Sequence, residues 1–306
     1  METLVNHSPD STICTGNRCA DVFACSEVNH ESALSGMLVV SIVLFETKFS
    51  DLLECLVCIE RAYAVALRAG RLSGLKVVLA DNSATPCLDE RALDRIRIVC
   101  PGLTYLHGHG NIGYGAGNNL AQAQVAGASF RLVLNPDAFL EPDSLEKGLM
   151  ALQQYDGAVM ACPEGSTPDG MKAWLCKNHP SIFVLALRSV APRCLRDHFR
   201  YVLARYELQH LVQGPHPVRV PIGSGCCMLI RGETFDAIDG FDPGFFLYFE
   251  DFDLSLRLGG RGAVLFVPEM RIMHKGGRAF RKGWHHRGLF AASAFRYFGK
   301  HGWRWF

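Results

Sequence analysis

Three carboxylates directly follow an aromatic run, and they form the most chemically suggestive cluster in the chain. Residues 245–249 are apolar and mostly aromatic; Glu250, Asp251 and Asp253 come next, followed by leucines at helical spacing. An acid seated against aromatic rings loses hydration, which raises its pKa toward the range of a working general base. Because a helix dipole also favours carboxylates in the first turn, these residues alone fit both a capped helix and a catalytic site.

Two other segments have residue types suited to a metal and a diphosphate. Asn135-Pro136-Asp137 follows a predicted strand, where one carboxylate can hold Mg²⁺ or Mn²⁺ while phosphate oxygens fill other positions of the metal. Asn-Pro-Asp is also common turn chemistry, so a plain turn is the alternative. His274 opens a basic, glycine-containing loop at 274–277 that suits a diphosphate, although a lone histidine is often structural.

A glycine-rich loop at 107–119 contains a formal GxGxxG at Gly108, Gly110 and Gly113. In a dinucleotide-binding fold that motif follows the first strand, whereas here it follows the third predicted strand, which excludes the dinucleotide interpretation. Glycines before a helix start still allow close approach of a phosphate or a sugar.

The elements that position these residues alternate in α/β style from residue 37 onward. Buried apolar runs predict strands, and helical spacing predicts helices between them. The predicted strands are 39–45, 76–80, 103–106, 131–134 and 221–230, and the predicted helices are 51–69, 118–128 and 181–210. This alternation predicts a mostly parallel sheet. Asp81, Asn111 and Asp137 each come just beyond a predicted strand, at the edge where open α/β sheets bind ligands.

Composition narrows the classes of protein. The chain has 306 residues and a net charge of +1, which argues against nucleic acid as the main partner. No run reaches the roughly 20 apolar residues of a membrane span. Residues 1–36 lack the pattern of a secretory signal, so we expect a reduced, cytoplasmic protein.

The cysteines predict core thiols more than metal sites. Cys55 and Cys58 form a CxxC, but they fall within a helical pattern of apolar residues. The cysteines of the first 36 residues match no tight zinc template; they are Cys14, Cys19 and Cys25, with His7 and His30 nearby.

The end of the chain is basic and aromatic. After Glu269 there is no acidic residue, while nine lysines and arginines follow. Such a tail suits the surface of an anionic membrane. A helix packed on the domain with a solvated basic face is the alternative.

Seven segments, taken in order, resemble the inverting family 2 glycosyltransferases with the GT-A fold. Within that family the chain is most similar to bacterial rhamnosyltransferase-like members that build surface polysaccharides. The resemblance covers about residues 37–280. The segments are VVSIVLFET, VVLADNS, NIGYGAGNN, LVLNPDAFLEPDSL, GSGCCMLIRGETFDAIDGFD, FFLYFEDFDLSLRL and VPEMRIMHKGG.

The resemblance implies a Rossmann-like, mostly parallel central sheet flanked by helices, forming a single GT-A catalytic domain at 37–277. A poorly ordered N-terminal extension at 1–36 and the basic aromatic tail at 278–306 would flank this domain.

The resemblance also implies roles for individual residues. Asp251 matches the general base, with Glu250 in support, and Asp137 and His274 match the metal and diphosphate site. Asn135 stands where many relatives have the first acid of Asp-x-Asp; it offers an oxygen without charge, which leaves the degree of metal dependence open. The residues expected to contact the donor are Phe45, Thr47, Asp81, Asn111, Gly113 and Asn135, with Asp81 on the nucleotide base.

The implied reaction is a direct displacement at the anomeric carbon of a nucleotide-diphosphate sugar. dTDP-rhamnose is the first choice of donor, with UDP- and GDP-sugars open, and the acceptor is a glycan or a lipid-linked saccharide. Mg²⁺ or Mn²⁺ is the implied cofactor, and the tail would hold the protein on the inner face of the cytoplasmic membrane. A non-catalytic sugar-nucleotide or glycan-binding module and a glycoside hydrolase are the rival interpretations.

Overall fold

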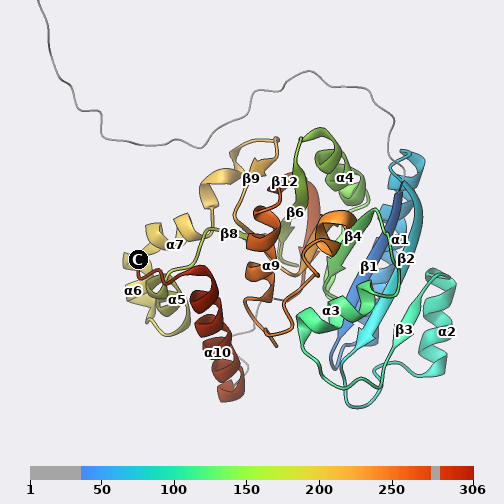
Figure 1. Cartoon of the computed structure of the whole chain (residues 1–306), viewed down its shortest axis with the longest axis horizontal. Coiled ribbons are helices and arrows are strands. Elements are labelled where there is room, and N and C mark those ends of the chain that lie inside the picture. Colours follow the sequence, from blue (N-terminus) through green and yellow to red (C-terminus); the bar gives the residue numbers. More distant parts are fainter. Residues whose placement is uncertain (1–35, 277–282) are drawn as a thin grey trace, which may run out of the picture. The chain divides into compact units, whose positions relative to one another are not determined.

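A mixed β-sheet organises the part of the chain that the structure describes. Its main strands are β1 (Gly36–Leu44), β2 (Leu72–Asp81), β3 (Thr104–Leu106), β4 (Phe130–Leu134), β5 (Ala138–Leu140), β6 (Ala158–Ser166), β11 (Cys227–Arg231) and β12 (Ala263–His274). Their order is β3-β2-β1-β4-β11-β6-β12-β5 (Figure 1). Pairing is parallel from β3 through β4 and between β6 and β12, while β11 and β5 run antiparallel to their neighbours in this row. The predicted α/β fold with a mostly parallel central sheet is confirmed.

The structure, a computed structural model, describes residues 36–276 and 283–306, with the backbone alone at 212–213 and 283–285. The expectations for the N-terminal extension and its cysteines therefore lie outside the described residues, as does the part of the tail at 277–282.

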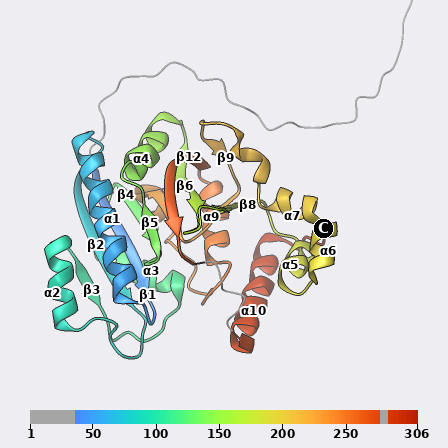
Figure 2. The same ribbon diagram turned by 180° about the vertical axis from the view of Figure 1, so that it is seen from behind.

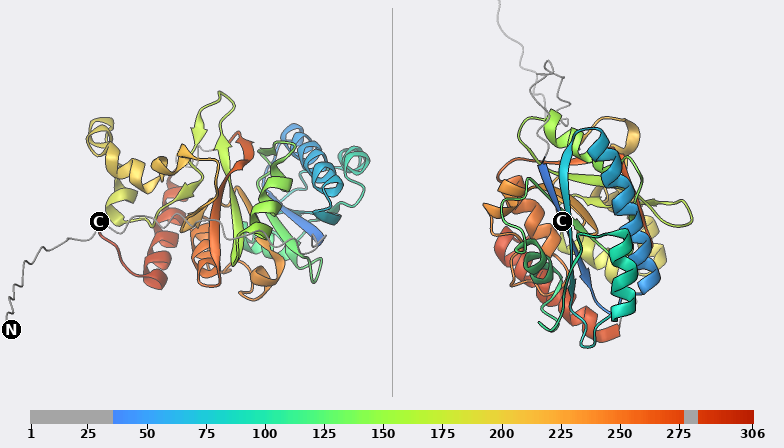
Figure 3. Two further views of the ribbon diagram at one scale, coloured as in Figure 1. Left: turned by 90° about the horizontal axis from the view of Figure 1, so that it is seen from above. Right: turned by 90° about the vertical axis from the view of Figure 1, so that its right-hand side faces the viewer.

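Helices cover both faces of the sheet. The helices α1 (Phe49–Arg68), α2 (Glu90–Val99) and α4 (Ser144–Gln154) belong to one face, and Figure 2 shows α1 and α4 in front of the strands. The helices α3 (Tyr114–Gln122) and α9 (Glu250–Gly259) lie on the opposite face, as the view in Figure 3 shows. Between these two helical layers the apolar strands are buried on both faces.

The helix α1 illustrates how the sequence pattern becomes packing. Its buried positions recur at helical spacing and include Leu52, Cys55, Leu56 and Ile59. Cys55 is fully buried and Cys58 is partly buried, and both are free thiols. The prediction that this CxxC belongs to the core is therefore confirmed.

The predicted strand at 221–230 is wrong in one informative respect, because it is interrupted. It consists of β10 (Ile222–Gly223) and β11, and the chain between them makes a turn in which the Cys227 amide bonds the Ser224 carbonyl. A second short strand, β8 (Cys176–Lys177), pairs with β10 away from the main sheet. The turn at 224–226 thus comes to the edge of the sheet next to the end of β4, where the Asn135 amide donates to the Cys226 carbonyl at 2.9 Å.

The predicted single helix at 181–210 is also wrong, because it breaks into pieces. These are α5 (Ile182–Ser189), α6 (Arg193–His198), α7 (Arg200–Tyr206) and the 3-10 turn η1 (Gln209–Gln213). Pro192 precedes α6, and proline cannot continue a helix because it lacks an amide donor. Leu208 has a left-handed backbone, which ends the run before η1. Together with the C-terminal helix α10 (Gly283–His301) these pieces gather beyond α9, at the left of Figure 1.

The helix α10 is anchored to the domain by buried charge. Asp253 is fully buried and accepts from Arg257 at 2.7 Å, from Lys300 at 2.7 Å and from His301 at 2.8 Å. Asp242 accepts from Arg296 at 3.1 Å and from Lys300 at 2.8 Å. Part of the basic tail is therefore paired inside the protein, as expected for the packed-helix alternative.

None of the helices within the described ranges has both the length and the apolar content of a membrane-spanning segment.

We expect Asp253→Asn to lower the free energy of unfolding by about 3 kcal/mol, because it leaves partly buried cations without their carboxylate. Burial alone would raise the pKa of Asp253, but hydrogen bonds from Lys300, His301 and Arg257 lower it. The stabilisation should therefore be complete above about pH 4 and should fade as the solution is made more acidic. Urea unfolding at pH 7 and at pH 3 measures both effects.

The control is Asp156→Asn at an exposed position, and we expect it to change the free energy of unfolding little. A loss in Asp253→Asn no greater than in this control would show that Asp253 does not anchor α10.

Candidate active site

The predicted site residues converge because of the sheet topology. β2 and β4 end at the same edge of the sheet, and β12 ends there as well at His274. β11 begins at this edge because it runs antiparallel to β4, with Cys227 opposite Leu134. The loop after β2, the Asn135–Asp137 turn, the 224–226 turn and His274 therefore border one surface.

Asp81 is held by donors from its own neighbourhood. Its carboxylate is fully buried and accepts from the Tyr105 hydroxyl at 2.5 Å, the Cys87 amide at 2.7 Å and the Ser83 amide at 3.0 Å. Burial would raise the pKa of Asp81, but these hydrogen bonds outweigh it and lower the pKa. An ionised Asp81 thus fixes the loop after β2, and its contact with a nucleotide base stays a prediction.

Asn82, which the sequence reasoning missed, joins the loops after β2 and β3. Its amide nitrogen donates to the Gly113 carbonyl at 3.0 Å, and its amide oxygen lies 2.9 Å from His109 Nε2. The Asn111 side chain accepts from the Gly113 amide at 3.2 Å. The polar run at 81–83 after a buried strand was the signal that could have drawn attention to it.

Phe45 and Thr47 follow β1 beside these loops. Phe45 is 54% exposed, and its amide donates to the Thr47 hydroxyl at 3.1 Å. An exposed ring at a ligand-binding edge offers a face on which a base can stack.

Asp137 and His274 form the pair that fits a divalent cation. His274 Nε2 lies 3.3 Å from Asp137 Oδ1, and the imidazole is largely buried. Although this distance is short, the geometry is not that of a hydrogen bond, and Nε2 has no hydrogen-bond partner among the described residues. A buried ring nitrogen facing a carboxylate oxygen is a suitable donor set for a metal.

Gly276 completes this pair. A Cβ added there would come within 2.6 Å of Asp137 Oδ2 and 2.8 Å of His274 Nε2, so a side chain would fill the space between the two ligands. Within the described ranges no cluster of three or more His, Cys, Asp or Glu residues suits a metal. A cation held by Asp137 and His274 would therefore need further oxygens from its diphosphate.

Asn135 faces Tyr114 instead of an open position. The Tyr114 hydroxyl lies 3.0 Å from Asn135 Oδ1 and 2.6 Å from the Gly225 carbonyl. Tyr114 is a connection that the sequence reasoning did not find, because nothing in the glycine-rich loop marks it as facing another segment.

The Asp251 carboxylate is held by the backbone of the 224–226 turn, whose Gly225 carbonyl accepts from Tyr114. Its Oδ2 accepts from the Gly225 amide at 2.9 Å, and its Oδ1 accepts from the Phe252 amide at 3.0 Å. A Cβ at Gly225 would lie 3.2 Å from the Cβ of Asp251 and 3.3 Å from the Tyr114 ring, so a glycine suits this close contact. Gly225 thus links Tyr114, which lies next to Asn135, to the predicted base.

Cys226 lies close enough to both Asp137 and Asp251 for their charges to affect its thiol. Burial raises the pKa of its thiol to about 12, and the charges of Asp137 and Asp251 contribute in the same direction. The structure therefore brings together Asp137, His274, Asn135 and Asp251 around residues 225–226.

Glu250 and Asp251 differ in the groups that surround them, and burial raises the pKa of both. Burial raises the pKa of Asp251, while the Gly225 and Phe252 amides oppose the rise. Burial and the neighbouring Asp251 charge raise the pKa of Glu250 well above its usual range, and Glu250 Oε2 has no hydrogen-bond partner. Burial and the neighbouring charge therefore favour the protonated form of Glu250, while two amide donors favour the carboxylate form of Asp251.

The backbone that leads into these acids is strained. Tyr248 and Phe249 both have left-handed backbone angles, with φ of 71° and 63°. Such angles are costly for bulky residues and concentrate at functional sites. Here they turn the chain so that α9 begins at Glu250.

A cavity of about 220 Å³ adjoins the two acids. Rings and two cations form most of its wall, and they come from β8, α5, α7, α9 and α10. The lining residues are Lys177, Leu185, Arg188, Tyr206, Tyr248, Phe249, Glu250, Asp251, Phe252 and Phe290.

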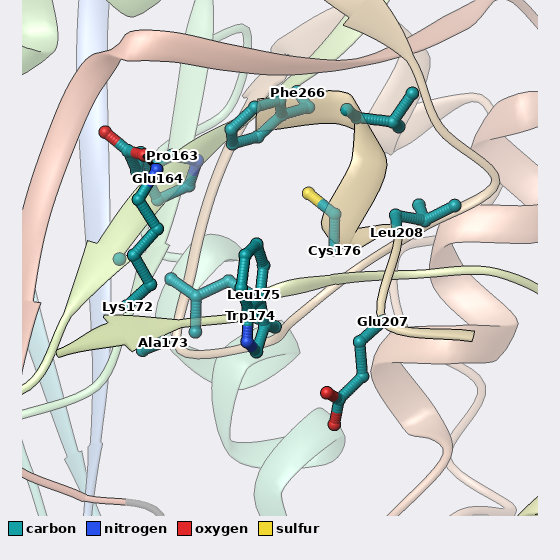
Figure 4. Close-up of a pocket in the computed structure, with 12 residues that line it drawn as sticks. Pro163, Glu164, Lys172, Ala173, Trp174, Leu175, Cys176, Glu207, Leu208 and Phe266 are labelled. Carbon is teal, nitrogen blue, oxygen red and sulfur yellow. Dashed lines mark hydrogen bonds and ion pairs between the residues drawn. The ribbon is translucent and has the colours of Figure 1, made fainter. Parts of the chain in front are cut away.

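A second, much smaller cavity lies under the hairpin of β6 and the short strand β7 (Lys172–Ala173), and Figure 4 shows Trp174, Leu175 and Phe266 in its wall. Its volume is about 20 Å³, which suits a single water molecule. It contains none of the predicted site residues, so we assign it no substrate.

Comparisons with known proteins agree with this geometry. No family model matches the sequence. The chain is 29% identical over 214 residues to N-acetylglucosaminyl-diphospho-decaprenol L-rhamnosyltransferase of Mycobacterium tuberculosis, covering 65% of this chain and 66% of that protein. It is 28% identical over 251 residues to rhamnosyltransferase WbbL of Escherichia coli, covering 74% and 82%. The matched region thus spans just under two thirds of the mycobacterial relative.

Two solved structures share the fold. GalNAc-T7 with UDP, GalNAc and Mn²⁺ superposes with a TM-score of 0.56 at 16% identity, covering 78% of this chain and 43% of that one. The mannosyltransferase PcManGT from Pyrobaculum calidifontis, in complex with GDP-Man and Mn²⁺, gives 0.55 at 15% identity, covering 88% and 65%. These likenesses confirm the GT-A fold that the sequence predicts.

We expect Gly276→Ala to weaken Mn²⁺ binding by roughly tenfold or more, because the added methyl group would enter the space between Asp137 and His274. Electron paramagnetic resonance titration of Mn²⁺ in the presence of dTDP measures this without any turnover. Gly259→Ala, at a position with open space around it, is the matched control. Equal Mn²⁺ affinity in the two variants would argue against a cation at this pair.

Proposed function

We propose that this chain, a rhamnosyltransferase-like member of the glycosyltransferases with the GT-A fold, transfers a sugar from a nucleotide diphosphate to an acceptor hydroxyl with inversion. One observation carries the proposal. Residues 225–226 lie close to both a metal-type pair, Asp137 and His274, and a carboxylate, Asp251, that lines a cavity. A leaving diphosphate and an attacking hydroxyl need these two environments on opposite sides of one anomeric carbon.

The donor side lies over the ends of β1 to β4. The exposed ring of Phe45 and the neighbouring Thr47 would border the nucleotide, and Asn111 and Gly113 would lie near the donor. Asp81 holds the loop after β2 through three nearby donors, and its Oδ1, which accepts only from the Ser83 amide among the described residues, would accept from the nucleotide base. dTDP-rhamnose is the first choice because two relatives are named rhamnosyltransferases, and UDP- and GDP-sugars are the alternatives.

Asp137 and His274 would hold Mg²⁺ or Mn²⁺. When bound, the cation neutralises the charge that develops on the departing diphosphate. The neutral Asn135 contributes no charge here, and its side-chain oxygen lies 3.0 Å from the Tyr114 hydroxyl. Lys275 next to His274 pairs with Asp51 at 3.1 Å and Glu54 at 2.8 Å, which fixes the start of this loop against α1.

Asp251 is the general base. Its raised pKa makes it a better proton acceptor than an exposed aspartate, and the Gly225 amide holds one carboxylate oxygen in place. As the acceptor oxygen attacks, its proton passes to the Asp251 carboxylate. Glu250 stays neutral, which avoids a second negative charge beside the base.

The glycoside hydrolase alternative is less well supported. Hydrolases of that kind place two carboxyl groups on opposite sides of the scissile bond. Here Glu250 and Asp251 are consecutive residues in the first turn of one helix. A non-catalytic binding module differs from an enzyme in turnover alone, so the transfer assay below separates the two.

We expect Asp251→Asn to lower the rate of sugar transfer by roughly 10²- to 10⁴-fold while leaving donor affinity unchanged, because only the proton acceptor is lost. Glu250→Gln, by contrast, resembles the protonated acid and should keep most of the activity. Single-turnover transfer and calorimetric donor binding measure the two effects. Wild-type turnover in Asp251→Asn, or equal loss in both variants, would refute the assignment of the base.

We also propose that the protein binds the inner face of the cytoplasmic membrane through α5 to α7 and the end of the chain. Backbone hydrogen bonds from Ile182 to Arg304 and from Phe183 to Trp305 join the C-terminal residues to α5. Large apolar side chains are exposed on these segments: Val190, Leu195, Tyr201, Phe295, Trp303, Trp305 and Phe306. Exposed arginines accompany them: Arg193, Arg196, Arg200, Arg205 and Arg304.

This surface is continuous with the cavity. Leu185, Arg188 and Tyr206, which line the cavity, come from α5 and α7. A lipid-linked acceptor in the membrane would therefore reach Asp251 through the same group of helices. Rings and arginines together are the composition expected for binding at an anionic interface.

We expect the protein to sediment with phosphatidylglycerol vesicles and not with phosphatidylcholine vesicles. Replacing Arg193, Arg196 and Arg200 by glutamine should weaken this binding roughly 100-fold, at about 1 kcal/mol for each charge. The matched control replaces Arg61, Arg68 and Arg91, which are exposed on α1 and α2, and should bind like the wild type. Equal binding by both triple variants would mean that this surface does not contact the membrane.

A further inference from the structure

The cavity beside Asp251 has a cationic wall that a base and a neutral sugar do not require. Lys177 ends β8, Arg188 lies on α5, and Glu207 follows α7. Arg188 Nη1 donates to Glu207 Oε1, and Lys177 Nζ lies 3.7 Å from the same oxygen. The side chains of Lys177 and Arg188 are 13% and 30% exposed, so both cations are largely removed from water.

One carboxylate does not balance two cations. Within the described ranges, Glu207 is the sole acid that forms a salt bridge with either Lys177 or Arg188. Its second oxygen accepts from Gln209 at 2.8 Å, which fixes the carboxylate from the other side. Glu207 therefore orients the two cations, and these three side chains together carry one net positive charge in the same cavity as the Asp251 carboxylate.

The electrostatics of Lys177 agree with this count. Burial lowers the pKa of Lys177 to about 8, and repulsion from Arg188 adds to the effect of burial. The attraction of Glu207 raises the pKa of Lys177, but this effect is smaller than those of burial and Arg188. Lys177 and Arg188 thus share one salt-bridged carboxylate, that of Glu207.

Both cations are held in position by an aromatic ring. Lys177 Nζ lies 5.8 Å from the centre of the Tyr206 ring, and Arg188 Cζ lies 5.3 Å from it. Preformed positions reduce the entropy that a ligand must overcome, and a guanidinium fork matches phosphate oxygens closely.

We propose that Lys177 and Arg188 bind a phosphate or diphosphate group of the acceptor and thereby direct the acceptor hydroxyl toward Asp251. This inference rests on the proposed function, because it assigns the acceptor class of the same site. The rings of Tyr248, Phe252 and Phe290 would border the sugar or the lipid beyond the phosphate.

The test is calorimetric binding of geranyl diphosphate with EDTA present, compared with inorganic pyrophosphate and with geraniol. We expect geranyl diphosphate to bind, and Lys177→Gln and Arg188→Gln each to weaken it about tenfold or more, as for loss of a charged hydrogen bond. Arg91→Gln, at an exposed position on α2, should bind like the wild type. Pyrophosphate binding as tight as geranyl diphosphate would mean that a free anion is recognised instead of a lipid-borne one.

Asp137→Asn separates this subsite from the donor side. If it abolishes binding of geranyl diphosphate while Lys177→Gln and Arg188→Gln do not, the ligand occupies the donor site and the inference fails. Sugar transfer by wild-type protein, with no change in acceptor KM in the Lys177 and Arg188 variants, would refute the subsite and leave the proposed function standing. Absence of any transfer in the wild type would instead refute the proposed function.

A measurement on the wild-type chain avoids dependence on how the variants fold. Acetic anhydride labels neutral lysines, and mass spectrometry reports the labelling rate of Lys177. We expect geranyl diphosphate to slow labelling of Lys177 several-fold while geraniol does not, as for any ligand that covers a reactive amine. Equal rates with and without geranyl diphosphate would overturn the proposal.

Discussion

The reversed strand β11 is the constraint on which the rest of the site depends. It is inserted antiparallel between β4 and β6, and it therefore begins at the edge where its neighbours end. This brings the Gly225 backbone between two halves of the site: its carbonyl accepts from Tyr114, and its amide donates to Asp251. Without that reversal, the first turn of α9 would have no fixed relation to the Asn135–Asp137 turn.

The three acids at the start of α9 show how environment assigns different roles to like residues. Asp253 is surrounded by Arg257, Lys300 and His301, stays ionised and anchors α10. Glu250 is buried without a hydrogen-bond partner for Oε2, and burial raises its pKa well above the usual range. Asp251 lies between these extremes, with two amide donors and access to a cavity. Asp251, whose carboxylate has fewer donors than that of Asp253 but more than that of Glu250, is thus the acid best suited to accept a proton.

The fold and the edge of the sheet could be predicted from the sequence because both follow from local patterns. Alternating apolar strands and helices identified the α/β fold, and polar residues after the strands located Asp81, Asn111 and Asp137 at one edge. The interruption at 224–226 and the breaks in 181–210 were not predicted, since two glycines and one proline override the apolar pattern around them. Gly276 and the Lys177–Arg188 wall depend on contacts between distant segments, and no local pattern records such contacts.

The stereochemistry of sugar transfer tests most directly whether Asp251 acts as the base of a single displacement. The wild-type protein would be incubated with dTDP-rhamnose and a lipid-diphosphate-linked N-acetylglucosamine acceptor, and the anomeric configuration of the product read from its one-bond carbon–proton coupling. Attack by a hydroxyl activated at Asp251, on the side opposite the diphosphate at Asp137 and His274, predicts a product of inverted configuration. A product that retains the configuration of the donor would contradict a single displacement and the role of Asp251 as its base.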